Sequence, residues 1–119
     1  MNPSSSSISL GRLTKTHEYR RVYKKGKLFK GPLLWAYILV NKTGALKLGI
    51  SVSRKVIKKA TARNRTKRII RESLRSHKEK YKKACDLVVV IKKQAQGSSQ
   101  HSKQLSGEVA QALKKARII

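Results

Sequence analysis

Basic side chains recur along one stretch of this sequence at a spacing that suits binding to a polyanion. Residues 54–83 hold nearly half of the 30 Lys and Arg residues of the chain. At about 100° per residue in an α-helix, one arc collects cations and another collects apolar side chains such as Ile70 and Leu74. The basic arc contains Asn64, Lys67, Arg68, Arg71, Arg75 and Lys78. The pattern predicts an amphipathic helix from about Thr61 to Lys82, with one face to bury and one to bind phosphates.

The overall charge supports the same interpretation. The 119 residues carry 30 Lys and Arg against five Asp and Glu, for a formal net charge of +25. A merely solvated helix face usually mixes charges of both signs, because pairs four residues apart then attract. Here cations lie beside cations, which favours a polyanionic partner, with nucleic acid as the first candidate and an acidic membrane surface as the second.

Other classes of function are disfavoured. The longest apolar run, Leu33–Val40, is far shorter than the roughly 20 residues that span a bilayer. The few acidic residues and the three histidines are dispersed, and no nucleophile, base and acid are grouped, so we expect no catalytic residue and no metal site on this chain. The single cysteine, Cys85, cannot form an internal disulfide and indicates a reducing cytoplasm.

The elements that must position these residues follow from periodicity. Residues 1–11 are expected to be a flexible tail and residues 12–119 a single α/β domain. A short helix fits Thr16–Lys25, with Thr16 as N-cap and Gly26 just beyond its end. Leu33–Val40 is typical of a strand, and the turn residues Asn41–Gly44 indicate a hairpin.

The return strand alternates. Leu46, Leu48, Ile50 and Val52 are expected to face the core, and Lys47, Gly49, Ser51 and Ser53 the other side. Asp86–Ile91 is apolar enough to be a central strand. Residues 94–102 read as a polar linker, and a last helix follows around Leu105–Ala116. A strand, a long helix and another strand imply a crossover and a mixed sheet with helices packed on it.

One ordered block resembles a known family. Residues 62–72, which read Ala-Arg-Asn-Arg-Thr-Lys-Arg-Ile-Ile-Arg-Glu, resemble the Arg-Asn-Arg motif of the bacterial ribonuclease P protein subunit. Residues 48–55 resemble the strand that leads into that motif, and Arg12-Leu13 with Tyr19 and Val22-Tyr23 is similar to the family's first helix. The resemblance implies the order α-β-β-β-α-β-α, a mixed four-stranded sheet with an added strand near Lys27–Lys30, and an uncommon left-handed crossover.

The same resemblance implies a function. Family members bind a catalytic RNA subunit, which holds the Mg²⁺ ions, and the 5′ leader of precursor tRNA, whose removal gives mature tRNA 5′ ends. Carried over by position, and extended along the basic arc, the surface for the RNA subunit comprises Arg63, Asn64, Arg65, Lys67, Arg68, Arg71 and Arg75. A leader-binding cleft would comprise Tyr19, Tyr23, Tyr37, Ser51, Ser53, Arg54 and Lys55. No stable protein partner is expected.

Alternatives remain open at this point. A structural ribosomal RNA-binding protein has the same composition. A DNA-binding protein also carries a basic helix, but it is disfavoured because the sequence shows no helix-turn-helix pairing and no dimer seam. Without the resemblance, the helical spacing of Tyr19 and Tyr23 favours core packing over base stacking, and so does the place of Trp35 in an apolar strand. Arg65 points away from the basic arc on the helical wheel, so it ranks lowest among the motif residues.

Overall fold

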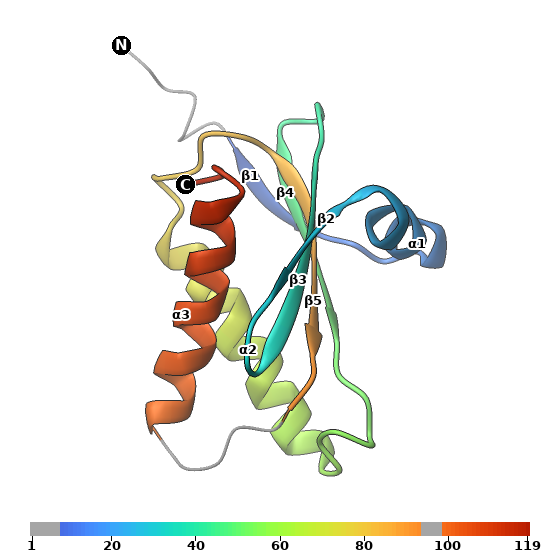
Figure 1. The fold of residues 1–119 in the computed structure, drawn as a ribbon, viewed down its shortest axis with the longest axis vertical. Helices are drawn as coiled ribbons and strands as arrows, with labels where there is room; N and C mark the ends of the chain where they lie inside the picture. The colour runs from blue at the N-terminus through green and yellow to red at the C-terminus, as the bar shows by residue number, and fades with distance from the viewer. Residues whose placement is uncertain (1–7, 94–98) are drawn as a thin grey trace.

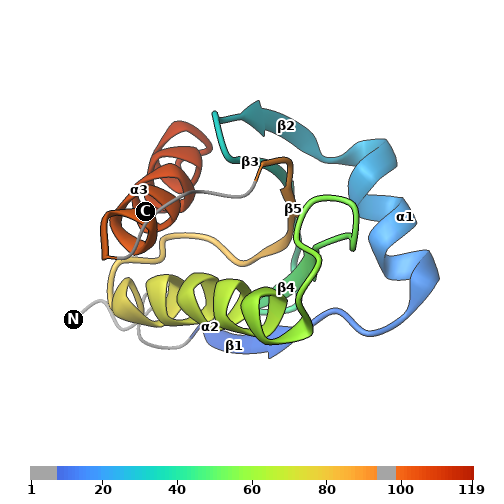
Figure 2. The ribbon, with the colours of Figure 1, turned by 90° about the horizontal axis from the view of Figure 1, so that it is seen from below.

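The computed structural model describes residues 8–93 and 99–119, which form three layers. A five-stranded sheet is covered by α1 on one face and by α2 and α3 on the other (Figures 1 and 2). In chain order the elements are β1 (Ser9–Arg12), α1 (Thr16–Lys25), β2 (Lys27–Lys30), β3 (Leu34–Val40), β4 (Ala45–Ser51), α2 (Ala60–Ser76), β5 (Cys85–Ile91) and α3 (Ser99–Lys115). The α/β class, the mixed sheet and the strand at Lys27–Lys30 are thereby confirmed.

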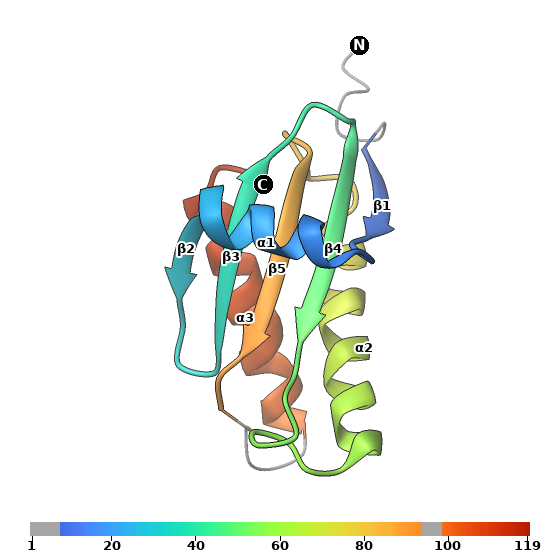
Figure 3. The ribbon, with the colours of Figure 1, turned by 90° about the vertical axis from the view of Figure 1, so that its right-hand side faces the viewer.

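The strand order is β1-β4-β5-β3-β2, with β5 in the centre. β5 runs parallel to β4 and antiparallel to β3. The predicted hairpin is therefore wrong, because the turn at Asn41–Gly44 links β3 to β4 across β5, as Figure 3 shows. The physical reason is that Cys85–Ile91 is buried almost throughout, so it gains most by lying between two neighbours.

The crossover from β4 through α2 to β5 is left-handed. With α1 towards the viewer in Figure 3, both strands point down, β5 lies to the left of β4, and α2 lies behind the sheet. This is the hand that the family resemblance implies and the opposite of the general preference for right-handed crossovers.

β1 is a fifth strand that the sequence did not reveal, so the expected four-stranded sheet has five strands and the element order begins with β1 instead of α1. Ser9–Arg12 pairs in parallel with β4, placing Leu10 beside Leu46 and Arg12 beside Leu48. The predicted tail thus ends earlier than residue 11, and its residues 1–7 lie outside the described part of the chain. Four residues with one large apolar side chain are too short a pattern to distinguish an edge strand from a loop.

α2 ends at Ser76, six residues before the predicted end at Lys82. Residues 77–80 form a turn, and Tyr81 then folds back so that its hydroxyl donates a hydrogen bond to the carbonyl oxygen of Leu74. The ring of Tyr81 is fully buried, as its place on the apolar arc predicted. The sequence predicted too long a helix because the turn at residues 77–80 places Tyr81 on the core side, as a continued helix would also have done.

α1 has the predicted bounds but a different N-terminal cap. Its N-cap residue is Lys15, not Thr16, and the carboxylate of Glu18 accepts hydrogen bonds from the backbone N–H groups of Thr14 and Lys15. These bonds lower the pKa of Glu18. Val22 is completely buried against the sheet, so one apolar side chain anchors the helix.

The two faces of the sheet carry different side chains because successive residues of a strand alternate. On β3, Leu34, Ala36 and Ile38 join the main core under α2 and α3. Tyr37 and Leu39 lie on the α1 side with Val22 and Val88. Only a small apolar cluster holds α1, whereas α2 and α3 cover the larger core.

α3 extends further towards the N-terminus than predicted. It begins at Ser99, so residues 99–102 of the predicted linker are helical, while residues 94–98 lie outside the described part. Its Glu108 carboxylate accepts hydrogen bonds from the backbone N–H groups of Leu33 and Leu34, at 3.0 and 3.1 Å. This contact ties α3 to the start of β3.

Candidate nucleic-acid interface

α2 presents its cations to solvent as the helical period predicted. Thr66, Ile70 and Leu74 are buried against the sheet, whereas Asn64, Arg65, Arg68 and Arg75 are exposed and Lys67 and Arg71 are half-exposed. In the described part of the chain the one ion pair joins Arg21 to Asp86, so no carboxylate pairs with these cations. We define the basic surface of α2 by Asn64, Lys67, Arg68, Arg71 and Arg75, with exposed Arg65 beyond its edge by the helical period. Its charge is uncompensated, in the sense that no described carboxylate forms an ion pair with it.

Arg63 differs from the other motif residues. Its Nη1 atom donates hydrogen bonds to the carbonyl oxygens of Ile57 and Lys58, at 3.0 and 2.8 Å. Its side chain is half-buried and fastens the loop before α2 to the first turn of the helix. The helical wheel missed this role because the carbonyl partners precede the helix.

Two predicted tyrosines meet between α1 and the sheet. The rings of Tyr23 and Tyr37 lie edge to face, with centroids 4.9 Å apart and an interplanar angle of 87°. Tyr23 remains 40% exposed. Partial burial raises the pKa of Tyr23, and a hydrogen bond with Ser51 opposes this to a smaller extent, so its hydroxyl stays protonated near neutrality. An edge-to-face pair of this kind leaves part of a ring free to contact a base.

Tyr19 is more of a packing residue than Tyr23. Its ring lies over Gly49 of β4, where a Cβ atom would meet the ring at 2.6 Å. The side chain is half-buried, and its hydroxyl approaches the carbonyl oxygen of Leu13 at 3.4 Å. The contact with Gly49 and the partial burial support the core interpretation, and the binding role of Tyr19 stays a prediction.

The remaining predicted leader residues lie at the end of β4 and in the loop after it. Ser51 is half-buried, and Ser53, Arg54 and Lys55 are exposed. The carbonyl oxygen of Ser53 accepts hydrogen bonds from the backbone N–H groups of Val56 and Ile57, which makes a compact turn. Residues 52–59 connect the α1 side of the sheet to the basic surface of α2 on the other side.

Trp35 lies in a setting that the sequence did not indicate. It is half-buried and lies two residues before Tyr37 on β3, so both side chains are on the α1 side of the sheet. The ammonium groups of Lys30 and Lys92 lie 4.6 and 4.4 Å from its ring centroid. Cation–π contacts of this kind hold positive charge beside an aromatic surface. The two lysines are far apart in sequence, so only the pairing of β3 with β2 and β5 brings them together.

The acidic side chains do not assemble a metal site in the part of the chain that the structure describes. Glu18 and Glu108 bind backbone N–H groups, and Asp86 accepts hydrogen bonds from Asn41 and Arg21. Among described residues, no three His, Cys, Asp or Glu side chains are grouped as metal ligands. The described helices include none that is both long and apolar enough to cross a membrane.

The fold and the uncompensated basic surface define a class: a small α/β domain built to bind nucleic acid. Comparison with known proteins makes this specific. The family model of ribonuclease P matches residues 9–117, and the chain therefore belongs to the ribonuclease P protein family.

Individual relatives agree. The ribonuclease P protein component of Clostridium kluyveri is 39% identical over 107 residues, covering 88% of this chain and 93% of the relative. The structure of the Staphylococcus aureus RNase P protein is similar with a TM-score of 0.77 and 32% identity, over 90% of this chain and 95% of that one. The Thermotoga maritima RNase P protein has a TM-score of 0.70 and 27% identity, over 87% and 96%.

These similarities confirm the recognised family and the fold. The function is that of the protein component of ribonuclease P, a ribonucleoprotein endonuclease, so the chain associates with the ribonuclease P RNA. The ribosomal and DNA-binding alternatives lose their support, because the matching relatives are ribonuclease P proteins over nearly their whole length.

Proposed function

We propose that the chain binds the catalytic RNA of ribonuclease P through the basic surface of α2 and the 5′ leader of precursor tRNA on the α1 side of the sheet. In this proposal the RNA subunit carries out hydrolysis and the protein raises substrate affinity and cleavage efficiency. The observation that carries it is the uncompensated basic surface of α2 in a member of this family.

The assignment of the RNA subunit to α2 rests on charge and side-chain type. The basic surface is rich in arginine, whose planar guanidinium binds two phosphate oxygens at once and stacks on unpaired bases. Exposed Asn64 adds an amide that can donate to and accept from a base edge or a 2′-hydroxyl. Arg63 supports the surface by fixing the loop before the helix rather than by facing solvent.

The assignment of the leader to the other side rests on aromatic groups and small polar residues. Tyr23 and Tyr37 offer ring surface between α1 and the sheet, and Ser51 lies beside them. A single strand without fixed structure is bound by stacking on such rings and by cations along its backbone. Exposed Arg54 and Lys55 supply the cations at the end of β4.

Mg²⁺ is assigned mainly to the RNA subunit. Octahedral Mg²⁺ requires several free oxygen ligands, and three of the five carboxylates of this chain are already engaged with N–H donors. The donor set of the described residues does not fit a protein-held catalytic ion. The free, buried thiol of Cys85 is compatible with work in a reducing cytoplasm.

The test is cleavage of precursor tRNA by the RNA subunit, with and without the protein, across Mg²⁺ concentrations. We expect no cleavage by the protein alone and stimulation of the RNA subunit at low Mg²⁺. Absence of any stimulation would overturn the proposal.

A pair of variants tests the division into two surfaces. Arg68→Ala should weaken binding to the RNA subunit and reduce the slope of log affinity against log salt by about one. Tyr23→Ala should instead reduce discrimination between precursor and mature tRNA, by roughly 1–3 kcal/mol. Lys103→Ala on α3 removes a charge outside both surfaces and is the control. If Arg68→Ala and Tyr23→Ala both weaken binding to the RNA subunit, or both reduce discrimination between precursor and mature tRNA, the two-surface assignment is wrong.

A further inference from the structure

We propose that the hollow between β1 and α2 binds one unpaired nucleotide of the RNA subunit, with its base against leucine side chains and its phosphate against arginines. The inference rests on the proposed function and adds a specific site to it. β1 becomes part of the RNA-binding surface, although no pattern in the sequence marks it as such.

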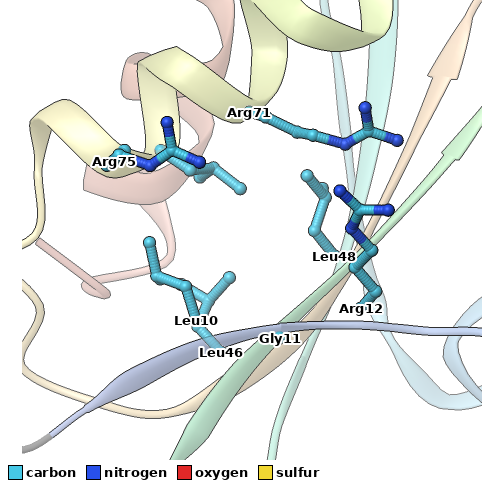
Figure 4. Close-up of a pocket in the computed structure, with 8 residues that line it drawn as sticks. Leu10, Gly11, Arg12, Leu46, Leu48, Arg71 and Arg75 are labelled. Carbon is cyan, nitrogen blue, oxygen red and sulfur yellow. The ribbon is translucent and has the colours of Figure 1, made fainter.

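The hollow has an apolar floor and a cationic rim. It has a volume of about 110 Å³ and is open to solvent. Figure 4 shows Arg12 of β1 and Arg71 and Arg75 of α2 around it, with leucines from β1 and β4 beneath. Its lining residues are Leu10, Gly11, Arg12, Leu46, Leu48, Arg71, Leu74 and Arg75. This volume is small beside the roughly 300–1,000 Å³ of sites for drug-sized ligands, so it suits one ring system.

Regular secondary structure brings these side chains together. Leu10 and Arg12 are two residues apart on β1, so they share the sheet face of their partners Leu46 and Leu48. Across the hollow, Arg71 and Arg75 are four residues apart on α2 and lie on one side of the helix. The geometry thus comes from rigid elements and not from a loop.

The charge at the rim lacks a protein partner. In the described part of the chain, no ion pair involves Arg12, Arg71 or Arg75. Three guanidinium groups around one small hollow repel one another, and an anion placed between them relieves that repulsion. In Figure 4 the guanidinium groups of Arg12 and Arg71 lie on the same side of the hollow, which suits a phosphate held from two elements.

The apolar floor of the hollow indicates a ligand that carries an apolar group as well as a phosphate. Leu10 is 38% exposed, although it lies directly beside the completely buried Leu46. A ligand that covers it must present an apolar surface next to its negative charge, and a nucleotide does so with its base. A nucleotide within a duplex keeps its base stacked inside the helix, so the base that binds in the hollow belongs to an unpaired nucleotide that is turned outwards.

The first experiment uses small probes on the full chain. Leucine methyl NMR signals would be followed during titration with adenosine monophosphate, inorganic phosphate and adenosine. We expect the monophosphate to shift the methyl signals of Leu10 and Leu46 and to bind more tightly than either other probe. If inorganic phosphate reproduces these shifts, or if the signals do not move, the hollow is not a nucleotide site.

The second experiment measures assembly with the RNA subunit at several salt concentrations. Leu10→Ala should lower affinity by roughly five-fold and leave the salt slope unchanged, because apolar contact is lost without loss of charge. Arg71→Gln should lower both the affinity and the slope, the latter by about one. Leu28→Ala is the matched control, since Leu28 is 36% exposed on the opposite edge strand, and it should change neither.

The outcomes separate this inference from the proposed function. If Leu10→Ala assembles like the unaltered protein while Arg68→Ala is weakened, the RNA-binding surface stands and the nucleotide site fails. If the unaltered protein itself neither binds nor stimulates the RNA subunit, the proposed function fails. Circular dichroism of Leu10→Ala confirms folding, which we expect because the side chain is partly exposed.

Discussion

Gly49→Ala is a sharp test of how α1 is held on the sheet. A Cβ atom at this position would lie 2.6 Å from two carbon atoms of the Tyr19 ring and 2.7 Å from its hydroxyl oxygen. Carbon atoms in favourable contact are about 3.5–4.0 Å apart, so the ring has to retreat by roughly 1 Å. Val22 of the same helix is completely buried, so the ring is freer to move than the helix.

The expected cost is that of overpacking, about 1–3 kcal/mol in the free energy of unfolding. In a domain of this size each kcal/mol corresponds to a fall of roughly 3–6 °C in Tm. Urea and thermal unfolding followed by circular dichroism measure both quantities. Because Tyr19 belongs to the predicted leader set and α2 lies on the other side of the sheet, affinity for precursor tRNA should fall while affinity for the RNA subunit is retained.

A double-mutant cycle identifies the cause. If the clash with Tyr19 is responsible, Gly49→Ala should cost much less in a Tyr19→Ala background, giving a coupling energy of about 1 kcal/mol or more. Additive losses would refute the reasoning, because they would mean that the added methyl group strains something other than the tyrosine ring. Unchanged stability of the single variant Gly49→Ala would refute it as well.

Two further outcomes are expected. Asp86→Ala should lower the free energy of unfolding in urea by about 2–3 kcal/mol, because the Asn41 amide, which donates to Asp86 at 2.7 Å, loses that partner. Arg21→Ala should lower it by under about 1 kcal/mol, since the Arg21 side chain is 55% exposed. Equal losses for the two variants would contradict this ranking. Burial raises the pKa of the Cys85 thiol to about 12, whereas a thiol in the unfolded chain ionises near pH 8.5. Between these two pH values unfolding releases a proton, so the free energy of unfolding falls as the pH rises, by up to about 1.4 kcal/mol per pH unit. Cys85→Ala should lose this part of the pH dependence, and identical profiles for the two proteins between pH 9 and 11 would show the thiol to be irrelevant.

The helical and apolar patterns predicted most of the fold because they reflect burial directly. α1 has the predicted bounds, and β5 is central as its continuous apolar run indicated. Long-range pairing was harder to predict. The turn at Asn41–Gly44 has the composition of a hairpin turn. Local turn residues carry no information about β5, which lies more than 40 residues later and buries more apolar surface by pairing between β3 and β4.

The features of the candidate site also fall into those that the helical period predicted and those that depend on tertiary contacts. The exposure of Arg68 and Arg75 follows from the helical period alone, so the sequence predicted it. The hydrogen bonds of Arg63 and the contacts of Trp35 with Lys30 and Lys92 depend on partners outside their own elements. Periodicity describes which side of an element a residue occupies, and tertiary structure decides what it meets there.

One short connection relates the two proposed RNA-binding surfaces. β4 carries Ser51 on the α1 side of the sheet, and residues 52–59 then lead directly to α2 on the other side. This connection is held at one end by the turn at Ser53 and at the other by Arg63, whose guanidinium bonds Ile57 and Lys58. A guanidinium can reach two carbonyl oxygens with fixed geometry, which a lysine does less well. Arg63 thus fixes the loop that precedes the basic surface of α2. In the proposed function, this loop would hold the leader-binding side and the RNA-binding surface in a fixed relation to each other.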